Sequence, residues 1–327
     1  MTLGKRVSIT ESRQAPNMPF KFDGGQLIAT RGGAKVYAFV TKPARERKTQ
    51  FDDEAHGQLF WGVYGTTPPL APGSALRADL YYLGFRDDHA RYASGTGAET
   101  RQTFGVRIFG SGAGFDYDVE PVLQSGTFGR QDILAWTLAS SQGYTMEGLP
   151  WSPRLGLQAD VASGDTGARN TGNFGTFNPL FFKAGYFDDA SLIRPSNIMD
   201  VHPTVQLHPR DSVQLIVGSD VLWRYTTKDG VYGPPGNLEL PAGGGDRYVA
   251  TRLRMSRRSG CSIDTWSGSS PTATSSPRST SALPRAATWT SSARGRRSSG
   301  DGQDLDQGVD HRRRRHRVVH DIAQALS

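Results

Sequence analysis

The feature that most limits how this chain can fold is an alternation of apolar and polar residues that recurs in six separate segments. In residues 75–85, for example, Leu76 and Leu80 alternate with Arg77 and Asp79. A period of two residues places successive side chains on opposite faces of a β-strand. The other five segments are 102–109, 115–123, 155–161, 213–223 and 248–255. The alternation therefore predicts an all-β fold built from two-faced strands.

Weaker strand signals lie in 2–10, 25–30, 34–41, 58–64, 132–140 and 203–208. About twelve strands result, and no amphipathic helix separates them, so we expect neighbouring strands to pair antiparallel. The 39 Gly and 19 Pro residues among 327 suit a fold with many turns. The chain has no run of eighteen apolar residues, which excludes a helical membrane protein but not a membrane barrel made of alternating strands.

Short and long connections alternate between these segments. Long connections cover 11–23, 42–55, 86–99, 163–202 and 226–245, whereas short ones cover 32–33, 67–73, 111–114 and 209–211. Only the connections near 125–130 and 141–151 break the pattern. An up-and-down membrane barrel has short turns at one end and long loops at the other, whereas a soluble sandwich has no reason to alternate. The sequence predicts an incomplete, antiparallel up-and-down transmembrane β-barrel over residues 1–255.

The charged residues of these strands are expected to face the inside of such a barrel, because an Arg or Lys on the lipid face near the midplane costs ~2–4 kcal/mol. The predicted pore lining is Arg77, Arg107, Arg154, Arg224, Arg252, Arg254, Asp79, Asp116, Asp118, Glu120, Asp160 and Asp220. Arginines would attract anions, while neighbouring carboxylates would hold the guanidinium groups and keep binding weak enough for transport. The alternative is that these charges merely neutralise one another across adjacent strands.

Residues 256–327 differ in composition from the rest of the chain. They contain twelve Arg, no Lys and six Asp, a net charge of +6 out of the total +7, so the preceding residues carry only +1. The single cysteine, Cys261, also lies there, so the body has no disulfide framework. The ordinary interpretation is a disordered, basic low-complexity tail. We hypothesise instead that this stretch is out-of-frame translation, so the Arg run at 312–315 is not a nucleic-acid site.

Enzyme and metal signatures are absent from the body of the chain. It has no nucleophile elbow, zinc-protease motif, phosphate loop or dinucleotide fingerprint, and no cofactor or metal is expected. The carboxylate pairs at 52–53, 87–88 and 188–189 are expected in solvated loops, and the histidines lack ligand spacing. The segment 164–199 could cover the pore mouth or contact sugar rings through its aromatic residues, although ordinary packing of Phe174, Phe177, Phe181 and Tyr186 is the simpler interpretation.

Several motifs together resemble the alginate-export family. They are LGKRV (3–7), ESRQAPN (11–17), FDG (22–24), LFWGVY (59–64), DLYYLG (79–84), AWTLAS (135–140), PRLGLQADVASGD (153–165), GTFNPLF (175–181), DVHP (200–203) and DGVYGP (229–234). The resemblance runs in order from about residue 3 to residue 255. It implies a bacterial outer-membrane barrel with an arginine-lined pore for an acidic polysaccharide such as alginate, with outer-membrane lipid and the periplasmic export machinery as partners.

The resemblance also implies features that the sequence lacks. Family members carry a signal peptide and further N-terminal strands, whereas this chain opens with MTLGKRVSIT. The chain thus resembles a member truncated at its N-terminus.

Two function classes remain open from the sequence. The first is a non-enzymatic outer-membrane channel for an anionic polysaccharide or a related anionic solute. The second is a soluble β-rich lyase or hydrolase acting on acidic polysaccharide. What lies against the apolar faces separates them, because a sandwich buries those faces against each other and a barrel leaves them outside.

Overall fold

The computed structural model describes residues 21–45, 53–54, 57–167, 172–182, 193–234 and 236–259. The tail beyond 259 and the expected strand at 2–10 lie outside these ranges. Within them the regular structure is β-strand. No helix in the described ranges is long and apolar enough to cross a membrane.

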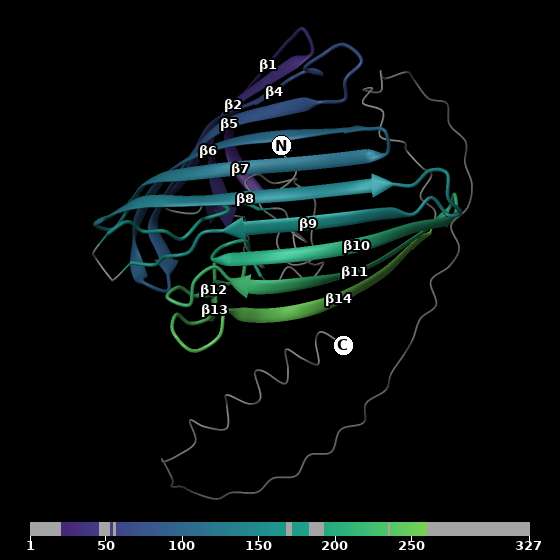
Figure 1. Ribbon diagram of the computed structural model, residues 1–327. Coiled ribbons are helices and arrows are strands. Elements are labelled where there is room, and N and C mark those ends of the chain that lie inside the picture. Colours follow the sequence, from purple (N-terminus) through teal and green to yellow (C-terminus); the bar gives the residue numbers. More distant parts are fainter. Residues whose placement is uncertain are drawn as a thin grey trace, which may run out of the picture. The chain divides into compact units, whose positions relative to one another are not determined.

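Eleven strands follow one another in a single antiparallel sheet (Figure 1). They are β1 (Lys21–Arg31), β2 (Ala34–Arg45), β4 (Gln58–Thr66), β5 (Arg77–Tyr92), β6 (Gly95–Gly112), β7 (Phe115–Phe128), β8 (Gln131–Thr145), β9 (Arg154–Ala162), β10 (Ile198–Arg210), β11 (Val213–Arg224) and β14 (Tyr248–Ser259). The short β3 (Asp53–Glu54) pairs with β2, and β12 (Val231–Tyr232) forms a separate hairpin with β13 (Leu238–Leu240). The prediction of an all-β, up-and-down sheet is confirmed, and each of the eleven strands lies on a segment predicted to be one.

The connections between strands correct part of the predicted loop pattern. The connection expected across 86–99 is a two-residue turn, because β5 continues through Tyr92 and β6 begins at Gly95. The Asp87–Asp88 pair therefore lies in a strand, where the Asp87 carboxylate accepts a hydrogen bond of 2.8 Å from Gln58 on β4. The remaining long connections, β2–β4, β9–β10 and β11–β14, all lie at one end of the sheet, which we call the long-loop end. The opposite end is the short-turn end.

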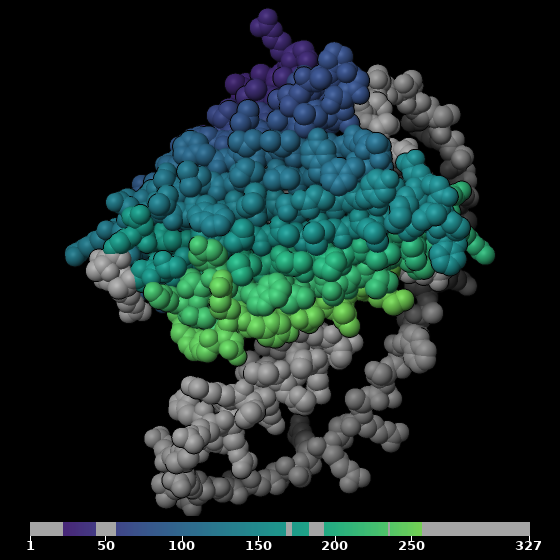
Figure 2. Space-filling model, viewed as in Figure 1, coloured from purple at the N-terminus to yellow at the C-terminus, as the bar shows by residue number. Residues whose placement is uncertain are grey.

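The two faces of the sheet carry opposite kinds of side chain. On the outer face Leu80 is 57% exposed and Phe104 is 51% exposed, whereas Asp79 on the inner face is only 4% exposed. Figure 2 shows the surface formed by β5 to β14. The apolar residues exposed on this face of the paired strands include Ile108, Leu123, Leu134, Leu138, Leu155, Leu157, Val201, Val205 and Val217. Neighbouring strands align these positions in register, so the outer face is an apolar wall.

The buried core lies on the inner face toward the long-loop end, and it is aromatic. Phe39, Phe60 and Phe85 from the sheet contact Phe181 or one another, with ring centroids 4.9 Å apart for Phe39–Phe60 and for Phe60–Phe181. Phe174 packs against Phe128 at 4.6 Å. The segment that follows β9 thus fills this end of the inner face, and its described phenylalanines serve as packing residues. Tyr186 lies outside the described residues.

Candidate pore lining

Arg107 on β6 is the centre of one charged group on the inner face. Its Nε and Nη2 donate to the two carboxylate oxygens of Asp118 on β7, at 2.9 and 2.8 Å. Its Nη1 donates to Asp79 on β5 at 3.2 Å, and the Asp79 carboxylate also accepts a hydrogen bond of 2.7 Å from the Tyr64 hydroxyl. The fork-shaped guanidinium therefore joins two strands through charge-assisted hydrogen bonds.

Arg154 on β9 reaches Asp116 on β7 across the intervening strand β8. Its Nε and Nη2 donate to the Asp116 carboxylate at 2.8 and 2.6 Å. Two glycines make this reach possible: a Cβ at Gly143 or at Gly156 would overlap the Arg154 guanidinium. The Asp116 side chain is 40% exposed and that of Arg154 is 19% exposed, so this pair is open to solvent.

Tyr81 on β5 crosses β6 in the same manner. Its hydroxyl donates a hydrogen bond of 2.6 Å to Glu120 on β7. The ring lies over Gly105, where a Cβ would overlap it. A glycine on the middle strand thus lets a long side chain lie flat across that strand and form a hydrogen bond with the strand beyond it.

The strands β9 to β14 carry a second charged group. Asp160 and Asp200 face each other in register on β9 and β10. Asp220 on β11 faces Arg252 on β14 and forms an ion pair with it. Arg254 faces Gly218 one row nearer the short-turn end.

Two of the predicted lining arginines stand apart from these groups. Arg224 is 7% exposed and donates to backbone carbonyls of the β11–β14 connection, including that of Gly244 at 3.0 Å. These bonds fasten that connection to β11. Arg77 lies at the start of β5, in register with Phe109 on β6. The register of the strands places all twelve predicted residues on the inner face. Seven of them meet in the Arg107–Asp118–Asp79, Arg154–Asp116 and Arg252–Asp220 contacts, and Glu120 bonds to Tyr81.

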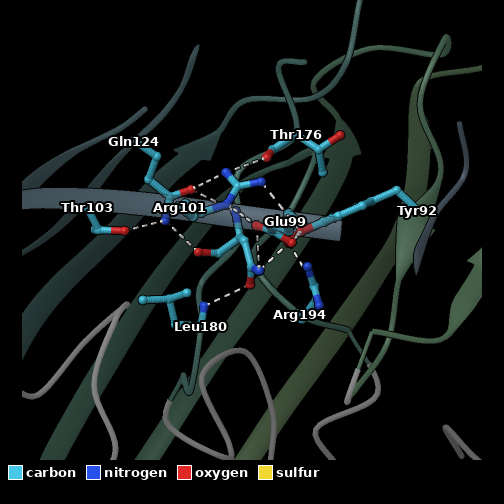
Figure 3. Close-up of polar contacts among 10 residues, drawn as sticks. Tyr92, Glu99, Arg101, Thr103, Gln124, Thr176, Leu180 and Arg194 are labelled. Atoms are coloured by element: carbon cyan, nitrogen blue, oxygen red, sulfur yellow. Dashed lines mark hydrogen bonds and ion pairs between the residues drawn. The ribbon is translucent and has the colours of Figure 1, made fainter. Parts of the chain in front are cut away.

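A fully buried network that was not predicted lies at the long-loop end (Figure 3). Arg101 and Glu99 on β6 are 0% and 1% exposed and form an ion pair. Arg101 also donates to Gln124 on β7 at 2.7 Å and to the carbonyl of Thr176 at 3.1 Å. Gln124 in turn donates to the carbonyl of Asn178 at 2.7 Å. The network therefore fixes the segment after β9 to the sheet.

Asp229 provides a second anchor for the same segment. Its carboxylate accepts hydrogen bonds from the backbone N–H of Asp165 at 2.9 Å, from the Thr176 hydroxyl at 2.6 Å and from Tyr232. Burial raises the pKa of the Asp165 carboxyl; the Gly167 N–H opposes this rise and the charge of Asp229 adds to it. Burial, followed by the charge of Asp229, also raises the pKa of Tyr232.

The buried Glu99–Arg101 pair could have been predicted if the strand predicted at 102–109 had been extended toward its N-terminus. Glu99 and Arg101 share the inner-face parity of Arg107, so the alternation in 102–109 points to them once the strand is extended toward Gly95. Asn178 and Asp229 carry no such signal, because they lie in connections. Among the described residues no three His, Cys, Asp or Glu side chains are grouped to hold a metal ion.

Comparison with known proteins gives one family. The sequence model described as alginate export matches residues 5–264, which is most of the chain. A search of curated proteins found no match. The matched range contains the whole sheet with both charged groups, and it nearly coincides with the range of about 3 to 255 over which the motifs resemble this family. The chain belongs to the alginate export family.

Proposed function

We propose that this chain forms the wall of an outer-membrane channel that exports an anionic polysaccharide of the alginate type, or a related anionic solute. The observation that carries the proposal is the division of the sheet into an apolar outer face and an inner face of paired arginines and carboxylates. Family membership supports export as the role and the bacterial outer membrane as the place. Outer-membrane lipid and the exported polymer are then its partners, and periplasmic export proteins would deliver that polymer.

The length of the apolar outer face along its strands, as well as its polarity, suits a bilayer. Trp136 and Tyr144, both on the outer face of β8, are 38% and 50% exposed. Eight residues of strand span about 27 Å, which is about 21 Å along the membrane normal for a strand tilted by about 40°. That length approaches the apolar band of about 25 Å that aromatic residues border in outer-membrane barrels. We infer that these two side chains lie near opposite interfaces.

The arrangement of connections supports one orientation. Outer-membrane barrels have short periplasmic turns and long extracellular loops. On that basis the short-turn end, which carries Arg154 and Asp116, faces the periplasm. The aromatic core and the Arg101 network then lie toward the outside. An exported polymer would meet the solvent-exposed Arg154–Asp116 pair before it reaches the buried network.

Pairing with carboxylates is expected to limit how strongly the arginines hold a polyanion. A guanidinium that already donates to a carboxylate can still attract an anion, but the carboxylate repels it. Transport requires such weak, repeated sites, because a strongly bound polymer would stall. The pairs at Arg107, Arg154 and Arg252 give three such positions along the wall.

The soluble-enzyme alternative has less support. It requires the apolar faces of the sheet to be buried against a second layer. Leu80, Phe104 and Leu134 are each more than half exposed, and they lie on a continuous outer face. This exposure favours a lipid-facing wall and a role that is not enzymatic.

The test uses two substitutions in the Arg154–Asp116 pair, one that leaves a net positive charge and one that leaves a net negative charge. Asp116→Asn leaves Arg154 without its counter-charge and should raise the preference for chloride over potassium. Arg154→Gln leaves the Asp116 carboxylate alone and should lower that preference. Reversal potentials in planar bilayers under a salt gradient measure both effects. The double charge reversal Arg252→Glu with Arg254→Glu should lower anion preference further.

Asp132→Asn provides a matched control, because Asp132 is an exposed residue near the β7–β8 turn. Its reversal potential should equal that of the wild type. Equal reversal potentials for the wild type, Asp116→Asn and Arg154→Gln would show that this pair does not face the conducting path and would count against the proposal.

A further inference from the structure

A row of small residues crosses four strands of the inner face near the short-turn end. Gly143 on β8, Gly156 on β9, Thr204 on β10 and Gly218 on β11 are in register with one another. Strands lie about 4.8 Å apart, so the row is about 14 Å long. Since three of its four residues have no side chain, groups from adjacent rows can lie flat over it.

Two glutamines and a histidine border this row toward the short-turn end. The Gln214 amide N–H donates to the Gln206 amide oxygen at 3.4 Å, and it lies 3.3 Å from Nε2 of His208. All three side chains are half-buried. Hydrogen bonds of this length are weak, so a ligand that offers better geometry can replace them at small cost.

On the other side of the row lies a buried group with unused hydrogen-bonding capacity. His202 is 8% exposed, and its Nε2 has no hydrogen-bond partner. A Cβ at Gly218 would lie 3.1 Å from this nitrogen, so the ring borders the small-residue row. Buried polar atoms are nearly always hydrogen-bonded, and an exception calls for a partner such as a water molecule or a ligand.

Cationic side chains lie at both ends of the row. The Arg154 guanidinium lies over Gly143 and Gly156, and Arg254 is in register with Gly218. Amide and imidazole groups therefore lie between two guanidinium groups. A simple inorganic anion needs only the cations, whereas a sugar unit also presents hydroxyls that both donate and accept hydrogen bonds.

We infer that Gln206, Gln214 and His202 form a subsite that binds the hydroxyl groups of acidic sugar units whose carboxylates meet Arg154 and Arg254. This inference rests on the proposed function and names the groups that would distinguish a sugar polymer from other anions. Each Gln amide supplies an NH2 group with two N–H donors and a carbonyl oxygen that accepts, and the His ring supplies a further nitrogen. Binding of hydroxyls here is independent of the charge of the polymer.

The experiment measures block of the ion current by two linear oligomers of equal length, one of uronic acid units and one of neutral glucose units. The double variant Gln206→Ala with Gln214→Ala should keep the wild-type reversal potential, because no charge changes. Because the two amides no longer bond to the sugar hydroxyls, we expect both oligomers to block about tenfold more weakly, which corresponds to about 1.4 kcal/mol. Gln214→Asn, which keeps the amide but shortens its reach, should give an intermediate loss.

Gln58→Ala is the matched control, since Gln58 is a half-buried glutamine hydrogen-bonded at the long-loop end. It should leave block by both oligomers unchanged. If the oligomers block the wild type and the double variant equally, the inference is overturned. The proposed function still stands in that case, provided that the current is anion-selective. A wild-type current without anion preference would overturn the proposed function, and tenfold weaker block in the double variant would then still support the hydroxyl subsite.

Discussion

At the scale of single residues, glycine decides which charged groups meet across the inner face. Arg154 and Asp116 are separated by a whole strand, and so are Tyr81 and Glu120. Each pair forms only because the strand between them presents backbone without a Cβ. The pairs on adjacent strands, such as Arg107 with Asp118, need no such gap.

Gly143→Ala tests this role directly. The added methyl would overlap the Arg154 guanidinium and displace it from Asp116, which removes charge-assisted hydrogen bonds. We expect a loss of about 0.5–1 kcal/mol in the free energy of unfolding, because the pair is open to solvent; denaturant titration in detergent measures it. Gly112→Ala is the control, because nothing lies within 4 Å of its added Cβ. Equal stability of the two variants would contradict the role given to Gly143.

At the scale of elements, the segment between β9 and β10 depends on two buried polar anchors. The Glu99–Arg101 pair contacts it through Thr176 and Gln124, and Asp229 contacts it through Asp165 and Thr176. Removing one member of a buried ion pair leaves an uncompensated charge, which costs more than removing both. The anchors thus tie the stability of this segment to a few side chains.

Arg101→Met should destabilise the protein by about 3–5 kcal/mol, because Glu99 then stays buried without its counter-charge. The double variant Arg101→Met with Glu99→Gln should recover part of that loss. Thermal unfolding in detergent, followed by circular dichroism, measures both. A double variant less stable than Arg101→Met would show that the two residues do not act as a pair.

The raised pKa of Asp165 predicts how the packing of this segment depends on pH. Its contribution is fully present below the unfolded pKa of about 3.9 and is lost as pH rises through the raised folded pKa. Asp165→Asn keeps an uncharged acceptor for Gly167 and should resist proteolysis several-fold better than the wild type at pH 8, with little difference near pH 4. Asp211→Asn, in the exposed β10–β11 turn, should change neither rate. Identical pH profiles for the wild type and Asp165→Asn would refute the assignment.

At the scale of the whole molecule, the exposed apolar face requires lipid or detergent. Leu80 is 57% exposed on the outer face of β5, and Leu149 is 52% exposed in the β8–β9 connection. The two leucines have similar exposed fractions, but their surroundings in a bilayer would differ, because only Leu80 would face the hydrocarbon. Among the described residues β1 and β14 are the edge strands of the sheet, and an unpaired edge is costly in lipid, so each needs a pairing partner there.

Leu80→Arg should therefore lower the stability of the vesicle-inserted state by about 2–4 kcal/mol, whereas Leu149→Arg should change it by less than about 1 kcal/mol. Folding into vesicles, followed by the gel-mobility shift of heat-treated and untreated samples, measures the difference. Similar losses for the two variants would mean that Leu80 does not face lipid.

Local pattern was enough to predict the strands, their antiparallel order and the two faces, because a period of two residues is a property of each strand alone. It placed Arg107, Asp118 and Glu120 on the inner face without any knowledge of their partners. The turn at 93–94 was missed because Asp87 and Asp88 suggest a loop until the neighbouring strand supplies Gln58. Residues outside strands, such as Asn178, have no period to reveal them.

Sequence alone thus determined that the sheet of this protein has an apolar face and a charged face, since side-chain direction alternates along any extended chain. Tertiary structure decided which charges are neutralised, which arginine fastens a connection and how the segment after β9 fills the inner face. Those outcomes depend on strand register and on bare backbone at Gly105 and Gly143, which bring together residues distant in sequence.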